Sequence, residues 1–312
     1  MKKILIAGGT GLIGHAFIKA YHAQYQISVL TRNKNKAKAQ LANMNVIEWQ
    51  DQAALVQAIK ESDVVINLAG ENIGDRYWTA KQKKRIVDSR VGATSQLSTL
   101  ILTHNPSLYL INASAIGIYG LQSSIEGQQT YFYNEDSPLG DMPRDFISEV
   151  GQAWEAPLKK AQEQGLKSVQ LRFSVVLSKE GGMLKKLWLP FKIGLGGVVG
   201  TGRQPLSWIA ISDAISIIKL LVEKQSMTGP LNLVADEVVT QRDFAKTFAR
   251  QLNRPSFMPM PSWLVQLLFG QMGKELLLSG QSVQTNRLQE LGYKIQYPTL
   301  KEALAHELNM TY

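Results

Sequence analysis

The sequence predicts an α/β protein: a Rossmann-type, doubly wound parallel sheet with a smaller, mainly helical C-terminal lobe. A short apolar segment leads into glycines spaced three apart, Gly8, Gly11 and Gly14, and apolar and amphipathic segments then alternate as far as Phe173. Such an alternation is the pattern of successive βαβ units. The chain has 312 residues, and single hydrophobic cores stop growing near about 250–300 residues. We therefore expect a main domain and a second lobe.

The N-terminal segment KILIAGGTGLIG, residues 3–14, has the order strand, glycine turn, helix. Gly8 permits the tight turn, Gly11 lets the backbone approach a pyrophosphate, and Gly14 lets the helix pack against the strand. The start of the helix then presents free N–H groups to the phosphates. This motif predicts a dinucleotide site, the alternative being a turn without a ligand.

The remaining elements follow from the spacing of apolar residues. Strands are expected at Ile27–Leu30, Val46–Glu48, Val64–Asn67, Leu108–Ala113 and Ser168–Phe173, and helices near Lys34–Ala42, Gln52–Lys60, Ala80–Thr103 and Asp145–Gln164. A long loop, 117–144, follows a strand at the end of the sheet where ligands bind. Later helices are expected at Asp213–Lys224, Thr240–Leu252, Ser262–Leu278 and Leu300–Leu308. We divide the chain into a dinucleotide-binding domain, 1–180, to which later segments return, and a substrate lobe with a helical extension, 181–312.

Composition excludes several classes of protein. The chain has no cysteine, so disulfides, thiolate zinc sites and cysteine nucleophiles are excluded. We find neither a signal peptide nor an apolar run of about 20 residues, and expect a cytoplasmic protein without a membrane partner.

The charge of the chain does not indicate a nucleic-acid surface. The net charge is +9, but the basic residues form local groups at 32–38 and 81–85, which are typical of solvated helix faces. The histidines lack ligand spacing, so no metal site is expected.

The end of the second strand indicates which dinucleotide binds. Thr31 and Arg32 stand where an NAD-preferring site usually has a carboxylate for the ribose 2′-hydroxyl. A guanidinium holds a 2′-phosphate through paired, charge-assisted hydrogen bonds, so Arg32 favours NADP. The alternative is an exposed arginine at the start of a basic helix.

Motifs beyond the glycine turn resemble those of the extended short-chain dehydrogenase/reductases, a group that includes the nucleotide-sugar epimerases. They are NLAGENI at 67–73, DSR at 88–90, ASAIGIYG at 113–120, LRF at 171–173 and PLSWI at 205–209, with GKELLLS at 273–279 and RLQELGY at 287–293. The resemblance covers essentially the whole chain and is sharpest to an atypical, epimerase-like family with a C-terminal extension. It implies a dinucleotide cofactor and a small polar or nucleotide-linked substrate in a cleft between the lobes.

The expected site residues combine the motifs with this resemblance. Ser114, at the end of a strand, can orient a substrate oxygen, and Tyr119 is placed to donate a proton; local backbone bonding of Ser114 and packing of the Tyr119 ring are the alternatives. Residues expected to contact the cofactor are Gly8, Thr10, Gly11, Leu12, Ile13, Gly14, Thr31, Arg32, Leu68, Ala69, Gly70, Glu71, Arg90, Ala113 and Arg172.

The usual catalytic pair of the group is missing. Its members use a tyrosine as acid and base, with a lysine four residues later that lowers the tyrosine pKa. Aligned on Glu155, this chain has Ile147 and Gly151 at those positions. Two functions therefore stay open: an NADP-dependent epimerase or reductase with another proton donor, and a non-catalytic NADP-binding protein that regulates a partner or senses redox state. Either a monomer or a homodimer is expected.

Overall fold

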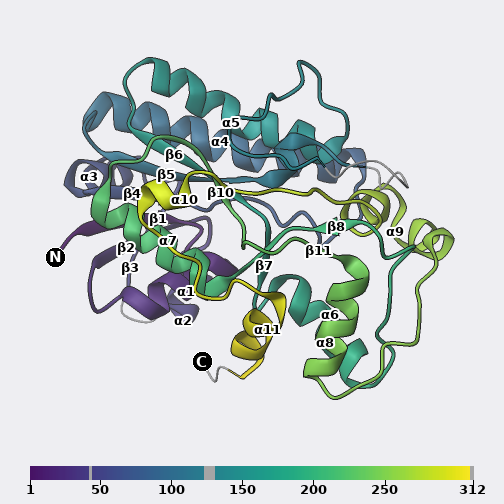
Figure 1. Ribbon diagram of the computed structural model, residues 1–312. Coiled ribbons are helices and arrows are strands. Elements are labelled where there is room, and N and C mark those ends of the chain that lie inside the picture. The colour runs from purple at the N-terminus through teal and green to yellow at the C-terminus, as the bar shows by residue number, and fades with distance from the viewer. Residues whose placement is uncertain (42–43, 123–130, 310–312) are drawn as a thin grey trace.

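The computed structural model describes residues 1–41, 44–122 and 131–309, and its centre is a seven-stranded parallel sheet (Figure 1). The strands lie in the order β10, β6, β5, β4, β1, β2, β3. Their bounds are β1 (Lys3–Ala7), β2 (Gln26–Thr31), β3 (Asn45–Glu48), β4 (Val64–Asn67), β5 (Tyr109–Ala115), β6 (Ser168–Phe173) and β10 (Gly229–Leu233). The predicted fold class is confirmed. The strand order reverses between β1 and β4, and ligands of such sheets bind at this switch point.

Both faces of the sheet are buried, because successive residues of a strand point to opposite sides. In β1, Ile4 and Ile6 belong to one core, whereas Leu5 and Ala7 belong to the other. The first core lies under α1 (Leu12–Tyr21) and α7 (Ile211–Lys224). The second lies under α3 (Gln52–Glu61), α4 (Ala80–His104) and α5 (Phe146–Glu163). Figure 1 shows these helices above and below the sheet.

Side-chain caps set where the helices near the site begin. Thr79 accepts the Gln82 N–H at the start of α4, and Asp145 and Ser148 form a reciprocal capping box at the start of α5. Both helices start within a residue of the predicted positions. The predicted end of the helix near Lys34–Ala42 and part of the loop 117–144 lie outside the described residues.

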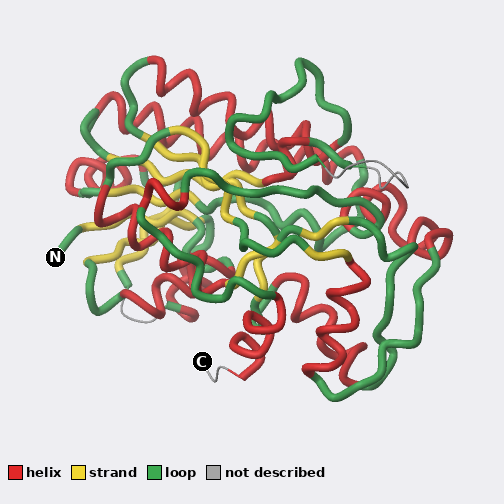
Figure 2. Tube along the Cα trace, in the orientation of Figure 1, coloured by secondary structure: helices red, strands yellow, loops and turns green. Residues whose placement is uncertain are grey.

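The smaller lobe is built by α6 (Gly182–Lys192), α8 (Gln241–Gln251), α9 (Ser262–Leu276) and α11 (Leu300–Asn309). Two short strand pairs join it to the sheet domain, β7 (Val175–Leu177) with β9 (Trp208–Ala210) and β8 (Pro205–Leu206) with β11 (Val239–Thr240). Figure 2 shows how much of this lobe is loop. No described helix has both the length and the apolar character needed to cross a membrane.

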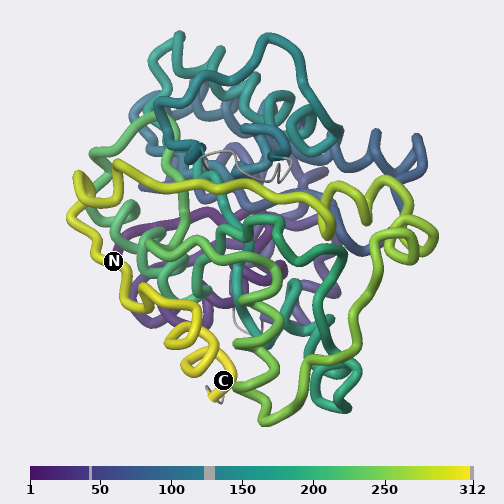
Figure 3. Tube along the Cα trace, turned by 45° about the vertical axis from the view of Figure 1, so that its right-hand side comes forward, coloured from purple at the N-terminus to yellow at the C-terminus, as the bar shows by residue number. Residues whose placement is uncertain are grey.

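The chain returns from the smaller lobe to the sheet twice. First, α7 and β10 complete the sheet domain, with β10 pairing with β6 at its edge. Second, the segment after α9 runs back across the molecule towards α10 (Leu288–Leu291) (Figure 3). There Asn232 of β10 donates its side-chain N–H to Gln284 O at 2.9 Å.

Candidate dinucleotide site

The glycine turn lies at the carboxyl end of β1, beside the switch point of the sheet. Gly8 has a φ of +83°, which favours glycine, and a Cβ there would lie 2.6 Å from Leu68 O. Gly14 is packed as tightly, since an added Cβ would lie 2.6 Å from Gly8 O. A Cβ at Gly11 would come near only Gly8 O, at 3.2 Å. This side of the turn is therefore open to a ligand.

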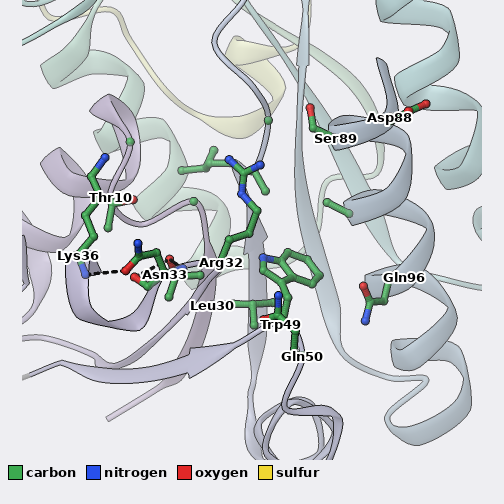
Figure 4. Close-up of a pocket in the computed structure, with 17 residues that line it drawn as sticks. Thr10, Leu30, Arg32, Asn33, Lys36, Trp49, Gln50, Asp88, Ser89 and Gln96 are labelled. Carbon is green, nitrogen blue, oxygen red and sulfur yellow. Dashed lines mark hydrogen bonds between the residues drawn. The ribbon is translucent and has the colours of Figure 1, made fainter. Parts of the chain in front are cut away.

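A pocket of about 670 Å³ lies beside the turn (Figure 4). Figure 4 shows Arg32, Leu30 and Trp49 on one side of it, with Ser89 and Gln96 of α4 opposite. Its lining residues come from the ends of β1, β2, β3 and β4 and from α4: Gly8, Thr10, Gly11, Leu30, Thr31, Arg32, Asn33, Lys36, Trp49, Gln50, Leu68, Ala69, Gly70, Asp88, Ser89, Ala93 and Gln96. The pocket thus brings together eight of the residues predicted to contact the cofactor.

The wall that follows β2 is basic. Asn33 accepts the Lys36 N–H at 2.9 Å and caps α2 (Lys34–Gln40), and Thr31 Oγ1 accepts the Asn33 N–H at 3.2 Å. These bonds fix the turn from which Arg32 and Lys36 reach the pocket. The Arg32 side chain is 70% exposed, and its Nη2 lies 3.8 Å from the Glu71 carboxylate.

The loop after β4 is tied to α4 through the backbone of Glu71. Ser89 Oγ accepts the Glu71 N–H at 2.9 Å, and Arg90 Nη1 donates to Glu71 O at 2.9 Å. Arg90 is buried against the Trp154 ring, and this burial lowers its pKa to about 10. Arg90 therefore holds the backbone of the loop in place through Glu71 O. The Glu71 carboxylate lies between two arginines, Arg32 at 3.8 Å and Arg85 at 3.7 Å.

Ser114, Tyr119 and Arg172 belong to one buried hydrogen-bond network. Arg172 binds Glu155 of α5 through two bonds, of 2.9 and 2.8 Å, and Ser114 Oγ donates to the same carboxylate at 2.6 Å. The Tyr119 hydroxyl, on η1 (Ile116–Tyr119), accepts from Arg172 Nη1 at 2.8 Å and donates to Asn232 at 2.9 Å. Burial raises the pKa of Tyr119, an effect that Arg172 opposes. Both hydroxyls expected to face a substrate thus have protein partners.

Three further predicted residues lie outside the lining of this pocket. Leu12 and Ile13 begin α1, where the Leu12 side chain packs against Gly181 at the entrance to the smaller lobe. Ala113 is buried within β5.

The positions of the missing tyrosine and lysine are packed against η1. Ile147 lies against Gly117, and its N–H donates to the buried Glu275 carboxylate at 3.1 Å. A Cβ at Gly151 would lie 2.7 Å from Ile118 Cα. A lysine at position 151 would therefore require η1 to move.

Nine lining residues were not among the predicted cofactor contacts: Leu30, Asn33, Lys36, Trp49, Gln50, Asp88, Ser89, Ala93 and Gln96. Lys36 had a usable signal, because it follows Arg32 by four residues within the same basic group, 32–38. Trp49 directly follows β3, whose carboxyl end meets the same edge of the sheet as β1 and β2.

The parallel sheet, the glycine turn and the pocket at the switch point define a Rossmann-type nucleotide-binding protein. A model described as "NAD dependent epimerase/dehydratase family" matches residues 4–233, and one described as "Domain of unknown function (DUF1731)" matches residues 260–307. The chain belongs to the NAD dependent epimerase/dehydratase family, as the resemblance of its motifs predicts.

Relatives match along almost the entire chain. The epimerase family protein YfhF of Bacillus subtilis is 35% identical over 305 residues, which are 97% of this chain and 96% of that protein. A crystal structure of human epimerase family protein SDR39U1 with NADPH has 32% identity and a TM-score of 0.86, covering 99% of this chain and 100% of that one. A UDP-N-acetylglucosamine 4-epimerase from Methanobrevibacter ruminantium, 18% identical with a TM-score of 0.77 and covering 98% of this chain and 97% of that one, shares the fold.

Proposed function

We propose that the chain is an NADP-binding, epimerase-like oxidoreductase that acts on a small polar or nucleotide-linked substrate. The observation that carries this proposal is the pocket beside the glycine turn, whose wall after β2 contributes Arg32 and Lys36. A 2′-phosphate needs such cations, whereas a carboxylate there would repel it. The NADPH in the structure of human SDR39U1, a similar protein, supports the same cofactor.

The residues present fit three parts of NADP, the pyrophosphate, the 2′-phosphate and the adenine. The open side of Gly11 and the start of α1 suit the pyrophosphate. Arg32 and Lys36 suit the 2′-phosphate, and Leu30 with Trp49 offers an apolar wall to the adenine. When bound, the nicotinamide supplies reversible hydride transfer.

In this proposal the buried arginines position the site rather than touch the substrate. Arg90 holds the backbone of Glu71 at the mouth of the pocket. Arg172 joins the carboxyl end of β6 to α5 through Glu155 and to η1 through Tyr119, and Ser114 joins the carboxyl end of β5 to the same Glu155 carboxylate. Ser114 and Tyr119 then act by fixing this framework, and a proton for the reaction comes from another group or from water.

A second candidate function is a non-catalytic NADP-binding regulator. It is favoured by the packing of Gly151 against Ile118, because the site has no room for the lysine of the usual catalytic pair. NADPH consumption with a panel of carbonyl compounds and nucleotide sugars separates the two. Turnover supports the enzyme, whereas tight NADPH binding without turnover across the panel supports the regulator.

The cofactor assignment is tested by calorimetric titration of variants with NADPH and NADH. In Arg32→Ala combined with Lys36→Ala, we expect NADPH to bind at least about tenfold more weakly, because charge-assisted bonds to the 2′-phosphate are lost, with little change for NADH. Lys38→Ala is the matched control, since Lys38 is an exposed lysine of α2 outside the pocket lining. Equal affinities of the double variant and the control for NADPH would contradict the assignment.

A further inference from the structure

Two segments of the smaller lobe carry positive charge without any negative charge. Residues 181–212 and 244–274 contain no aspartate or glutamate. Each contains four basic residues, which are Lys185, Lys186, Lys192 and Arg203 in the first and Lys246, Arg250, Arg254 and Lys274 in the second. The two segments therefore have a combined net charge of +8, which is close to the net charge of +9 of the whole chain. Lys186 is paired with Asp75 of the sheet domain.

The same two segments hold most of the large apolar side chains that are exposed among the described residues. Among the described residues, eight of thirteen exposed large apolar side chains lie in them, and we call these eight the lobe patch: Leu189, Ile193, Leu195, Phe257, Met258, Trp263, Leu267 and Leu268. Trp263 and Leu267, one helical turn apart on α9, are 66% and 74% exposed. Val265 of the same helix is fully buried, so α9 packs on the lobe through its other face.

Contacts between the two segments join them into one surface. Arg254 Nε donates to Lys192 O at 2.7 Å, and Met260 N–H donates to Val198 O at 2.9 Å. Figures 2 and 3 show the loops after α6 and before α9 running side by side. Lys192 and Arg254 therefore lie next to Ile193 and Phe257.

We propose that the lobe patch docks on the surface of an anionic lipid bilayer. Exposed Trp, Phe and Leu side chains insert at the level of the headgroups, and neighbouring Lys and Arg side chains attract anionic lipids. The absence of acidic residues from both segments removes the repulsion that would oppose this contact. The proposal concerns binding to the membrane surface, which requires no spanning helix; it revises the expectation of a chain without a membrane partner and is independent of the proposed cofactor.

The test is co-sedimentation of the full chain with vesicles of phosphatidylcholine, alone or mixed with phosphatidylserine. We expect binding to the mixed vesicles that weakens at high salt. Trp263→Ser with Leu267→Ser removes the inserted side chains and is expected to lower binding at least about tenfold. Lys192→Glu with Arg254→Glu is expected to abolish the preference for phosphatidylserine. The matched control, Tyr77→Ser with Met142→Ser, changes two exposed side chains outside the lobe patch and is expected to bind as the unmodified chain does.

Three results would overturn the proposal. The first is failure to bind either vesicle, and the second is binding that the Trp263→Ser, Leu267→Ser variant retains. The third is a concentration-dependent dimer in sedimentation velocity that this variant dissociates, which would assign the lobe patch to a second copy of the chain. Because the replaced apolar side chains are exposed, NADPH titration and thermal unfolding should be unchanged in the Trp263→Ser, Leu267→Ser variant and in the control, whether or not the bilayer proposal holds.

Discussion

At the scale of single residues, Arg172 and Glu155 form a buried ion pair on which the stability of the fold should depend. Burial by itself lowers the Arg172 pKa, but the hydrogen bonds and negative charge of Glu155 outweigh it, so this pKa lies above its ordinary value. Both side chains are nearly inaccessible, at 5% and 13% exposed. Removal of one partner therefore leaves the other as an uncompensated buried charge between β6 and α5.

Glu155→Ala is expected to lower the free energy of unfolding by about 3–5 kcal/mol, as measured by urea denaturation, because Arg172 loses its buried partner. Glu61→Ala, which breaks the exposed pair with Lys3, is the matched control and should change the free energy of unfolding little, because water screens an exposed pair. Similar losses in the two variants would show that the Arg172 network does not stabilise the fold.

The sequence predicted the pocket residues that belong to recognisable motifs, such as Gly8 and Arg32. It could not predict hydrogen-bond partners that are distant in the sequence. Ser114 has the appearance of a strand-end catalytic hydroxyl, yet its partner Glu155 lies 41 positions later. Tyr119 and Asn232 are 113 positions apart.

At the scale of elements, the packing of α5 against η1 decides what chemistry the site can support. Gly151 has room only for a hydrogen atom, whereas Gly92 of α4 has no neighbour within 4 Å of an added Cβ. The two glycines lie on adjacent helices that pack together. They allow the same substitution to be compared in tight and open surroundings.

Gly151→Ala is expected to lower the free energy of unfolding by about 1–3 kcal/mol, because the new methyl group overlaps Ile118. Gly92→Ala should raise it by up to about 1 kcal/mol, because alanine favours an exposed helical position over glycine. Thermal and urea denaturation measure both changes. A neutral Gly151→Ala variant would mean that η1 yields easily and that a larger side chain can be restored there.

Elements with a clear run of apolar residues, such as α4 and β4, were predicted within a few residues. The strands after β6 were missed, and β10 shows a physical reason. β10 begins with Gly229 and Pro230, which resemble a turn, and it is a strand because it pairs with β6, 60 residues earlier. Pairing between strands so far apart in the chain leaves little signal in the sequence of the strand itself.

At the scale of the whole molecule, the last described helix, α11, packs against α8 of the smaller lobe and against the strand pair β7 and β9 that joins this lobe to the sheet domain. Its His306 stacks on Tyr297, with ring centroids 4.2 Å apart, and hydrogen-bonds to the Tyr297 hydroxyl at 2.9 Å. Burial lowers the His306 pKa below its ordinary value, and Asp213 partly opposes this effect. The folded protein therefore binds a proton at His306 less readily than the unfolded chain does.

Stability should consequently fall as the pH decreases through the ordinary histidine pKa, near 6.5, because the unfolded state takes up the proton first. Urea denaturation at pH values above and below this point measures the effect. His306→Gln should reduce the pH dependence, while His15→Gln, at an exposed position of α1, should retain it. An unchanged pH dependence in His306→Gln would contradict the role assigned to His306.

The most direct test of the NADP site is calorimetric titration of the unmodified chain with NADPH and with NADH. The basic wall formed by Arg32 and Lys36 predicts that NADPH binds at least about tenfold more tightly, since its 2′-phosphate gains charge-assisted bonds that NADH lacks. Equal affinities, or tighter binding of NADH, would contradict the account.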